Sequence, residues 1–209
     1  MLGAVIGDIA GSRFEFDNYR HTDFDIFSPD SNFTDDTICT VAIADWVLQG
    51  CNDNLASILQ GWCRAYPCPK GAYGGRFSQW IEWKDPEPYN SWGNGSAMRV
   101  SAVGWAFATL EETLHFAKQS AIVTHNHPEG IKGAQAVAAA IFWARTGMEK
   151  ARIKENITRQ FGYDLSQSCD QIRPYYHFNE SCQETVPQAI TAFLGSDDFE
   201  HAIRLAVSL

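Results

Sequence analysis

Two adjacent carboxylates preceded by a hydroxyl are the residues of this chain best suited to chemistry. They are Thr34, Asp35 and Asp36, and they open a stretch whose apolar spacing is typical of a helix. At a helix start, three consecutive side chains can converge near the end of the axis, whereas in mid-helix they splay around it. Hydroxyl and carboxylate oxygens are the ligands that Mg²⁺ or Mn²⁺ prefers. The same residues also cap a helix and suit its dipole, so the run fits either a metal site or a cap.

Glu15 is the further acid that could join this group. A cation at a helix N-terminus faces the unfavourable end of the dipole, so a metal there needs additional acids. Glu15 directly follows the first expected helix, and Arg13 is its one nearby opposite charge in the sequence. We therefore predict Glu15 as a metal ligand and, with Asp35 and Asp36, as a candidate catalytic acid or base. The alternative is a solvated surface acid.

Two glycine-rich segments have the composition of ligand-binding loops. In the segment SWGNGSAMR, Gly93 and Gly95 permit close backbone approach, and N–H groups at the following helix start can meet an anion. The segment is not a Walker A loop, because it lacks the Lys-Ser/Thr ending. It is not a Rossmann fingerprint, because it follows no strand. Trp92 could stack on a base or ribose. A tight turn before a capped helix fits equally well. The second segment, a ligand-bordering loop or a plain connector, contains Tyr73, Gly74 and Gly75.

The segment THNHPEG holds His125 and His127 two residues apart. It has no surrounding strand-strand-helix pattern, no basic surface and no spaced Cys/His partner, which argues against a nuclease or a zinc site. His125 is a candidate donor to a substrate phosphate or ribose; a hydrogen-bonded structural histidine is the alternative.

Composition excludes several classes of protein. The 209 residues carry a net charge of −9 with no Lys/Arg run, which argues against a nucleic-acid partner. The apolar N-terminal stretch is short and meets Asp8 early, so it predicts neither a signal peptide nor a membrane span. Cys39 and Cys63 lie in apolar, helical stretches as buried free thiols do, which indicates a reducing, cytoplasmic compartment.

Helical spacing dominates the chain, and no stretch alternates with period two, so we predict an all-α fold. Thr34 is expected to cap a helix, Thr109 with Glu112 and Ser181 with Glu184 to form capping boxes, and Ser196 to cap the last helix. Residues 21–33 and the segment KGAYGGRF are expected to be loops. The predicted helices are an opening one over Leu2 to Ile9, then 35–49, 54–66, one from Ser96 through Phe107, 114–123, 128–147, 148–161, 182–194 and 197–209.

Five segments in series resemble the ADP-ribosylglycohydrolase family, which includes dinitrogenase reductase-activating glycohydrolases. They are GAVIGDIAGSRFE, TDDT, SWGNGSAMR, THNHPEG and SCQETVPQAITAFL…FEHAIRLAVSL. The resemblance implies an orthogonal bundle of helices and a binuclear magnesium or manganese site that uses Glu15, Thr34, Asp35 and Asp36. It implies that the diphosphate and distal ribose contact Ser91, Trp92, Gly93, Asn94 and Gly95. It also implies that His125 faces the ligand and that the loop of Tyr73, Gly74 and Gly75 borders the substrate.

Relatives continue into a Gly-Gly-Asp-x-Asp-Thr motif that supplies further metal oxygens, whereas this sequence ends at Leu209. We therefore expect a single domain over 1–209 that is C-terminally truncated. The resemblance predicts metal-dependent hydrolysis of a glycosidic bond between ADP-ribose and a protein side chain or small acceptor. The alternative is a catalytically impaired ADP-ribose-binding module that lacks the last metal ligands. A purely structural helical protein would bind neither metal nor nucleotide.

Overall fold

The computed structural model describes residues 1–209, and its regular elements are helices. No β-strand forms, and two isolated bridges, Thr34 with Lys70 and Gly93 with Ser181, are its β-type pairings. None of the helices is both long and apolar enough to cross a membrane. The helices are α1 (Leu2–Gly11), α2 (Asp35–Leu48), α3 (Leu55–Ala65), α4 (Gly75–Glu82), α5 (Gly95–Met98), α6 (Ser101–Ala106), α7 (Leu110–Ile122), α8 (Pro128–Arg145), α9 (Lys150–Phe161), α10 (Cys169–Ile172), α11 (Cys182–Gly195) and α12 (Phe199–Val207).

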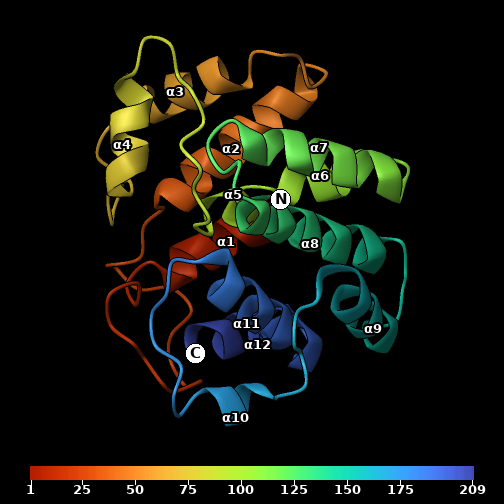
Figure 1. Ribbon diagram of the computed structural model, residues 1–209. Coiled ribbons are helices and arrows are strands. Elements are labelled where there is room, and N and C mark those ends of the chain that lie inside the picture. Colours follow the sequence, from red (N-terminus) through yellow and green to blue (C-terminus); the bar gives the residue numbers. More distant parts are fainter.

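Helix α8 is the centre of the bundle. It contacts α5, α6, α7, α9 and α11, and in Figure 1 it crosses the middle of the molecule. Its sequence explains the position, because a helix that is apolar on all sides must be covered on all sides. Small side chains let those neighbours approach closely, and the buried ones are Ala134, Ala136, Ala138, Ala139 and Ala140.

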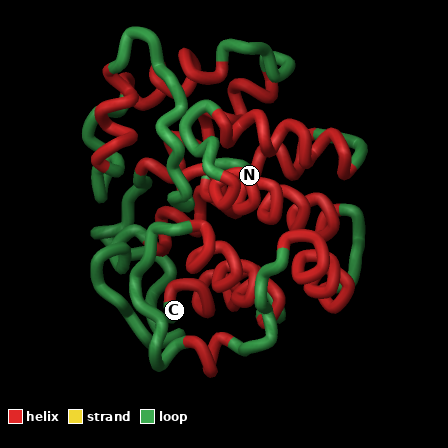
Figure 2. The backbone as a smooth tube through the Cα atoms, viewed as in Figure 1, coloured by secondary structure: helices red, strands yellow, loops and turns green.

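Two apolar cores meet at α8. The larger is built by α2, α3, α4, α6 and α7 with one face of α8, and the other by α9 and α11 with its opposite face. Long loops cover one end of the bundle (Figure 2). There the loop after α1 is tied to the loop before α11, because Arg20 donates to the Tyr176 carbonyl and the Phe178 amide donates to Asn18 Oδ1.

The all-α prediction is confirmed, and so are several predicted helix starts. The Thr34 hydroxyl accepts from the Asp36 amide at 3.1 Å, as an N-cap does. Thr109 and Glu112 form both halves of a capping box. Pro128 occupies the first turn of α8, where its missing N–H costs nothing.

Two predictions in the middle of the chain are wrong. The segment KGAYGGRF is not loop throughout, because α4 begins at Gly75 and buries Phe77 in the larger core. The helix expected from Ser96 through Phe107 is broken. Arg99 and Val100 adopt φ/ψ of −92/−5 and −80/−2, so their ψ angles depart from that of a regular α-helix and form a turn. The turn separates α5 from α6, and each packs against α8.

Two caps near the C-terminus also differ from the prediction. The Ser181 hydroxyl accepts from the Glu184 amide, but the Ser181 amide donates to Asn179 Oδ1, so the capping box is only half formed. The last helix is capped by Asp198, whose Oδ1 accepts from the His201 amide at 2.8 Å, and not by Ser196. In both places another polar side chain nearby takes the expected role.

Candidate functional site

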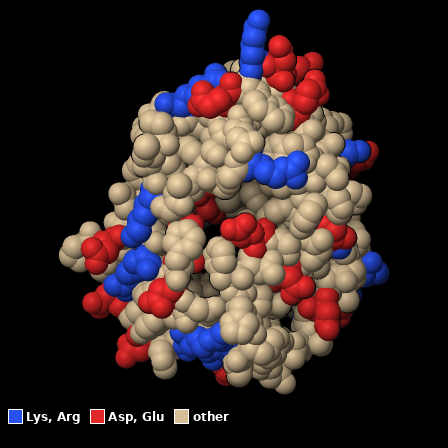
Figure 3. Space-filling view, turned by 60° about the vertical axis from the view of Figure 1, so that its left-hand side comes forward, with Lys and Arg blue, Asp and Glu red and all other residues tan.

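A cavity of about 660 Å³ gathers residues that are far apart in the sequence. It opens on the face of the molecule seen in Figure 3, where a hollow is flanked by acidic side chains. Both isolated bridges border it, so the backbone is paired where the loops meet. Among the predicted site residues, it is lined by Glu15, Thr34, Asp35, Asp36, Tyr73, Gly74, Gly75, Ser91, Gly93, Asn94, Gly95 and His125.

Trp92 is the one predicted site residue that does not line the cavity. Its side chain is 49% exposed, and its ring lies 5.6 Å from that of His127 in an edge-on arrangement. Its carbonyl accepts from the Cys182 amide, which fixes the backbone next to Gly93. The stacking role of Trp92 stays a prediction. His127 is an N-cap, because its Nδ1 accepts from the Glu129 amide.

One wall of the cavity is acidic and is organised by Asp8, which the sequence reasoning missed as a site residue. The Asp8 carboxylate on α1 accepts from the amide and hydroxyl of Thr34 at 2.9 and 2.6 Å. It also accepts from the amide and hydroxyl of Thr37. The start of α2 is thus capped by Thr34 and by an acid from another helix. Asp35 and Asp36 therefore face the cavity without being the main caps.

The acids of this wall repel one another, and their pKa values show it. Burial, followed by repulsion from Glu15, raises the pKa of Asp35 to about 7. Burial, followed by repulsion from Asp35, raises the pKa of Asp36 to about 8. The pKa of Glu15 is also raised, first by burial and then by Asp8. Glu15 Oε2 is buried and has no hydrogen-bond partner. Burial and repulsion therefore oppose full ionisation of these carboxyl groups when no further cation is near them.

The donor chemistry of this wall suits a hard divalent cation. Carboxylate and hydroxyl oxygens are offered by Glu15, Thr34, Asp35 and Asp36, and Glu15 Oε2 has no hydrogen-bond partner within the protein. As they stand, however, no three His, Cys, Asp or Glu side chains are grouped closely enough to enclose an ion. The wall supplies ligands of the right kind without a completed cage.

Another wall of the cavity is the glycine segment, and its conformation depends on close contacts. A side chain at Gly95 would put its Cβ 3.0 Å from His125 Nε2, and at Gly93 3.3 Å from the Ser91 hydroxyl. The Gly93 amide donates to Ser91 Oγ at 3.1 Å and the Asn94 amide to the Glu180 carbonyl at 2.6 Å. Those two amides are thus already bonded, so an anion would meet the start of α5 instead.

A second residue that the sequence reasoning missed, Arg99, lies beneath this segment. Its side chain is 1% exposed, lines the cavity and pairs with no carboxylate. It donates instead to the Ser120 carbonyl and the Thr124 hydroxyl, at 3.0 and 2.8 Å. In a chain of net charge −9, this cation makes the glycine wall locally positive. No signal in the sequence indicated this burial, because Arg99 lies beyond the last residue of α5.

His125 and the Tyr73 loop complete the lining. His125 is buried, and burial together with Arg99 holds its pKa well below the usual value, so the ring is neutral at pH 7. The Tyr73 hydroxyl donates to the Tyr66 carbonyl at 2.8 Å, which anchors the loop ahead of α4. Next to it, Gly71 has a φ of +81°. A Cβ at this position would overlap the Glu15 carboxylate. Only glycine meets both conditions without strain.

Fold and site together define a helical protein with one cavity between an acidic wall and a glycine wall. The model of the family "ADP-ribosylglycohydrolase" matches residues 1–209. The chain belongs to this family.

Individual relatives are distant. ADP-ribosylhydrolase ARH3 of Xenopus tropicalis is 26% identical over 70% of this chain and 49% of its own length. ADP-ribosylarginine hydrolase Tri1 of Pseudomonas putida (strain GB-1) is 26% identical over 100% of this chain and 64% of its own length. The chain thus spans about half to two thirds of these relatives. A solved structure named "ADP-ribosylglycohydrolase-related protein complex" shares the fold, with a TM-score of 0.70, 23% identity, and coverage of 99% of this chain and 78% of the other.

Proposed function

We propose that this protein hydrolyses the glycosidic bond between ADP-ribose and a protein side chain or small acceptor, with the help of Mg²⁺ or Mn²⁺. One observation carries the proposal: five acids and a buried arginine that pairs with no carboxylate line the same cavity. ADP-ribose has the matching polarity, with an anionic diphosphate and a ribose whose hydroxyls and anomeric carbon favour oxygen ligands and carboxylates.

Each wall then has a distinct task. The glycine wall binds the diphosphate, with the start of α5, the charge of Arg99 and the imidazole of His125 close to it. The acidic wall receives the ribose. Carboxylates there stabilise the positive charge that develops on the ring carbon and oxygen as the glycosidic bond breaks.

Glu15, Thr34, Asp35 and Asp36 would hold the divalent ion, which would supply a Lewis acid to orient substrate oxygens and water. The pKa values of Asp35 and Asp36, about 7 and about 8 without the ion, are close to the pH at which a proton must be taken up and returned. We propose Glu15, Asp35 and Asp36 as the catalytic acids and bases. The six free cysteines accord with the reducing, cytoplasmic compartment proposed for this reaction.

The test is release of free ADP-ribose from defined conjugates. Peptides that carry ADP-ribose on arginine (an N-glycosidic bond) and on serine (an O-glycosidic bond) are incubated with the protein in Mg²⁺, in Mn²⁺ and in chelator. We expect release from at least one conjugate that stops in chelator. Failure to release ADP-ribose from either conjugate with both metals would contradict hydrolysis.

Binding without turnover is a second candidate function, favoured by the absence of three grouped metal-ligating side chains. Magnesium demands near-octahedral ligation and gives up water reluctantly, so an open ligand set holds it weakly. Calorimetric titration with ADP-ribose, with and without Mg²⁺, separates the two functions. Tight binding of ADP-ribose together with no release from any conjugate would identify a binding module.

A further inference from the structure

A chain of three buried polar side chains runs beneath the glycine wall. Arg99 Nη2 donates to Thr124 Oγ1 at 2.8 Å, and Thr124 Oγ1 lies 2.7 Å from His125 Nδ1. The three side chains are 1%, 0% and 5% exposed, respectively. Because water scarcely reaches them, the partners within the protein decide where their hydrogens lie.

The hydrogen positions follow from what each group can do. A guanidinium only donates, so the Thr124 oxygen accepts from Arg99. The single hydroxyl proton of Thr124 then has His125 Nδ1 as its acceptor. Nδ1 must be unprotonated to accept, which places the proton of the neutral ring on Nε2. The opposite tautomer would leave a buried hydroxyl proton without an acceptor, and that is costly.

The other ring nitrogen faces the ligand cavity. A Cβ built on Gly95 would be 3.0 Å from His125 Nε2 and one on Gly93 3.6 Å from it, so Nε2 lies against the backbone of the glycine wall. The same segment is tied to Thr124, whose carbonyl accepts from the Ser91 amide. The protein thus uses Nδ1 for its own hydrogen bonding and presents Nε2–H to the cavity.

We propose that Arg99 and Thr124 are positioning residues that fix His125 in its Nε2–H tautomer, so that the ring is a permanent hydrogen-bond donor to an anion at the glycine wall. The ligand named here, the diphosphate of ADP-ribose, rests on the proposed function. The tautomer itself does not, because it follows from contacts within the free protein.

The experiment removes the Thr124 hydroxyl and measures which nitrogen of the His125 ring carries the proton. Long-range ¹⁵N–¹H spectra of protein labelled at histidine report which nitrogen carries the proton, and a His125→Asn spectrum assigns the His125 signals among the six histidines. Thr124→Val removes the hydroxyl at nearly constant shape, and Thr124→Ser keeps it. Thr113→Val is the matched control, because Thr113 is also fully buried but its hydroxyl donates to the Thr109 carbonyl within α7.

We expect the native protein, Thr124→Ser and Thr113→Val to show Nε2–H at His125, and Thr124→Val to show a mixture of tautomers. ADP-ribose should bind about tenfold more weakly to Thr124→Val alone, the loss of roughly one well-placed hydrogen bond. An Nδ1–H signal in the native protein would overturn the proposal, and so would a Thr124→Val spectrum like the native one. If the native protein binds no ADP-ribose, the proposed function fails, while the spectra still decide the tautomer.

Discussion

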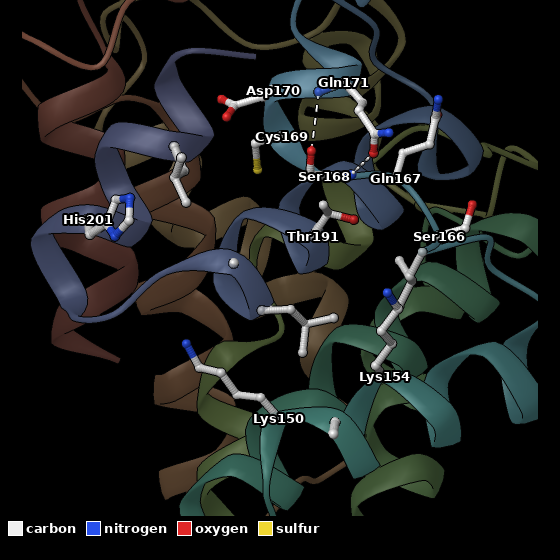
Figure 4. Close-up of a pocket in the computed structure, with 15 residues that line it drawn as sticks. Lys150, Lys154, Ser166, Gln167, Ser168, Cys169, Asp170, Gln171, Thr191 and His201 are labelled. Carbon is white, nitrogen blue, oxygen red and sulfur yellow. Dashed lines mark hydrogen bonds between the residues drawn. The ribbon is translucent and has the colours of Figure 1, made fainter.

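Two cavities of the molecule, of about 660 and 500 Å³, differ in whether their polar groups are already satisfied. The second, of about 500 Å³, lies among α9, α10, α11 and α12 (Figure 4). Lys150 Nζ there donates to the Phe193 carbonyl at 2.8 Å and to Ser196. Ser168 and Gln171 bond each other in a capping box, visible as the dashed pair in Figure 4.

In the cavity between the acidic and glycine walls, by contrast, key groups lack partners. Glu15 Oε2 and Arg99 Nε are buried without a hydrogen bond, and Asp35 and Asp36 repel each other. Volume therefore does not separate the two sites. What separates them is uncompensated charge, which costs the folded chain stability and is retained where a ligand can neutralise it. The second cavity uses its polar side chains to hold helix ends.

The largest expected effect is loss of turnover when one acid of the wall is neutralised. Asp36→Asn keeps the shape of the side chain but removes a proposed metal ligand and proton carrier, so ADP-ribose release should fall at least about 100-fold. Asp53→Asn, at an exposed acid in the turn before α3, is the control and should leave release unchanged. Initial rates with saturating conjugate are the measurement. Native-like rates of ADP-ribose release in Asp36→Asn would contradict the proposed catalytic role of the acidic wall.

The repulsion within the wall should also appear as pH-dependent stability in the absence of divalent ions. The folded pKa values of Asp35 and Asp36, about 7 and about 8, lie above the ordinary value of 3.8. Between about pH 4 and 8 the folded chain thus binds more protons than the unfolded chain, and the free energy of unfolding decreases as pH rises. We expect a loss of about 1–3 kcal/mol between pH 5 and pH 8, since the coupled acids share the cost.

Thermal and urea unfolding in chelator at both pH values measure this loss. Asp36→Asn is the informative comparison, because it should flatten the pH dependence. A native protein that is equally stable at pH 5 and pH 8 would mean that the acids are better solvated than their burial implies.

A similar effect on stability is expected from a methyl group placed at the junction of the acidic wall and the Tyr73 loop. Gly71→Ala forces alanine to a φ of +81° and pushes against the Glu15 carboxylate, so it should destabilise the fold by about 1–3 kcal/mol. Gly61→Ala is the matched control. It lies inside α3 with open space at its Cβ and should stabilise the fold by about 0.5–1 kcal/mol. Equal effects in urea unfolding would show that the Gly71 contact does not matter.

The smallest effect should come from the second cavity. Lys154 lines it and is exposed, so Lys154→Ala should change the free energy of unfolding by less than about 0.5 kcal/mol. It should also leave the dissociation constant of ADP-ribose within about twofold, measured by calorimetry. A large loss of ADP-ribose binding in this variant would show that the second cavity also takes part in binding.

The sequence by itself determined the all-helical fold and several helix starts. The sequence correctly predicted the helix-start roles of Thr34, the Thr109–Glu112 pair and Pro128. These roles depend only on residues a few positions away in the chain. The short α4 was missed since Gly74 and Gly75 at its start suggested a loop, while three buried apolar side chains in the tertiary structure stabilise the helix. The series of motifs was also enough to place the chain in its family.

Only the tertiary structure decided how the candidate site is charged. Asp8 is an ordinary helical acid in the sequence, and the packing of α1 against α2 makes it the cap of another helix. Arg99 reads as one more surface cation until the break after α5 buries it beneath the glycine wall. The physical reason is common to both: hydrogen bonding and pKa depend on burial and on distances between segments remote in the chain, which local spacing does not encode.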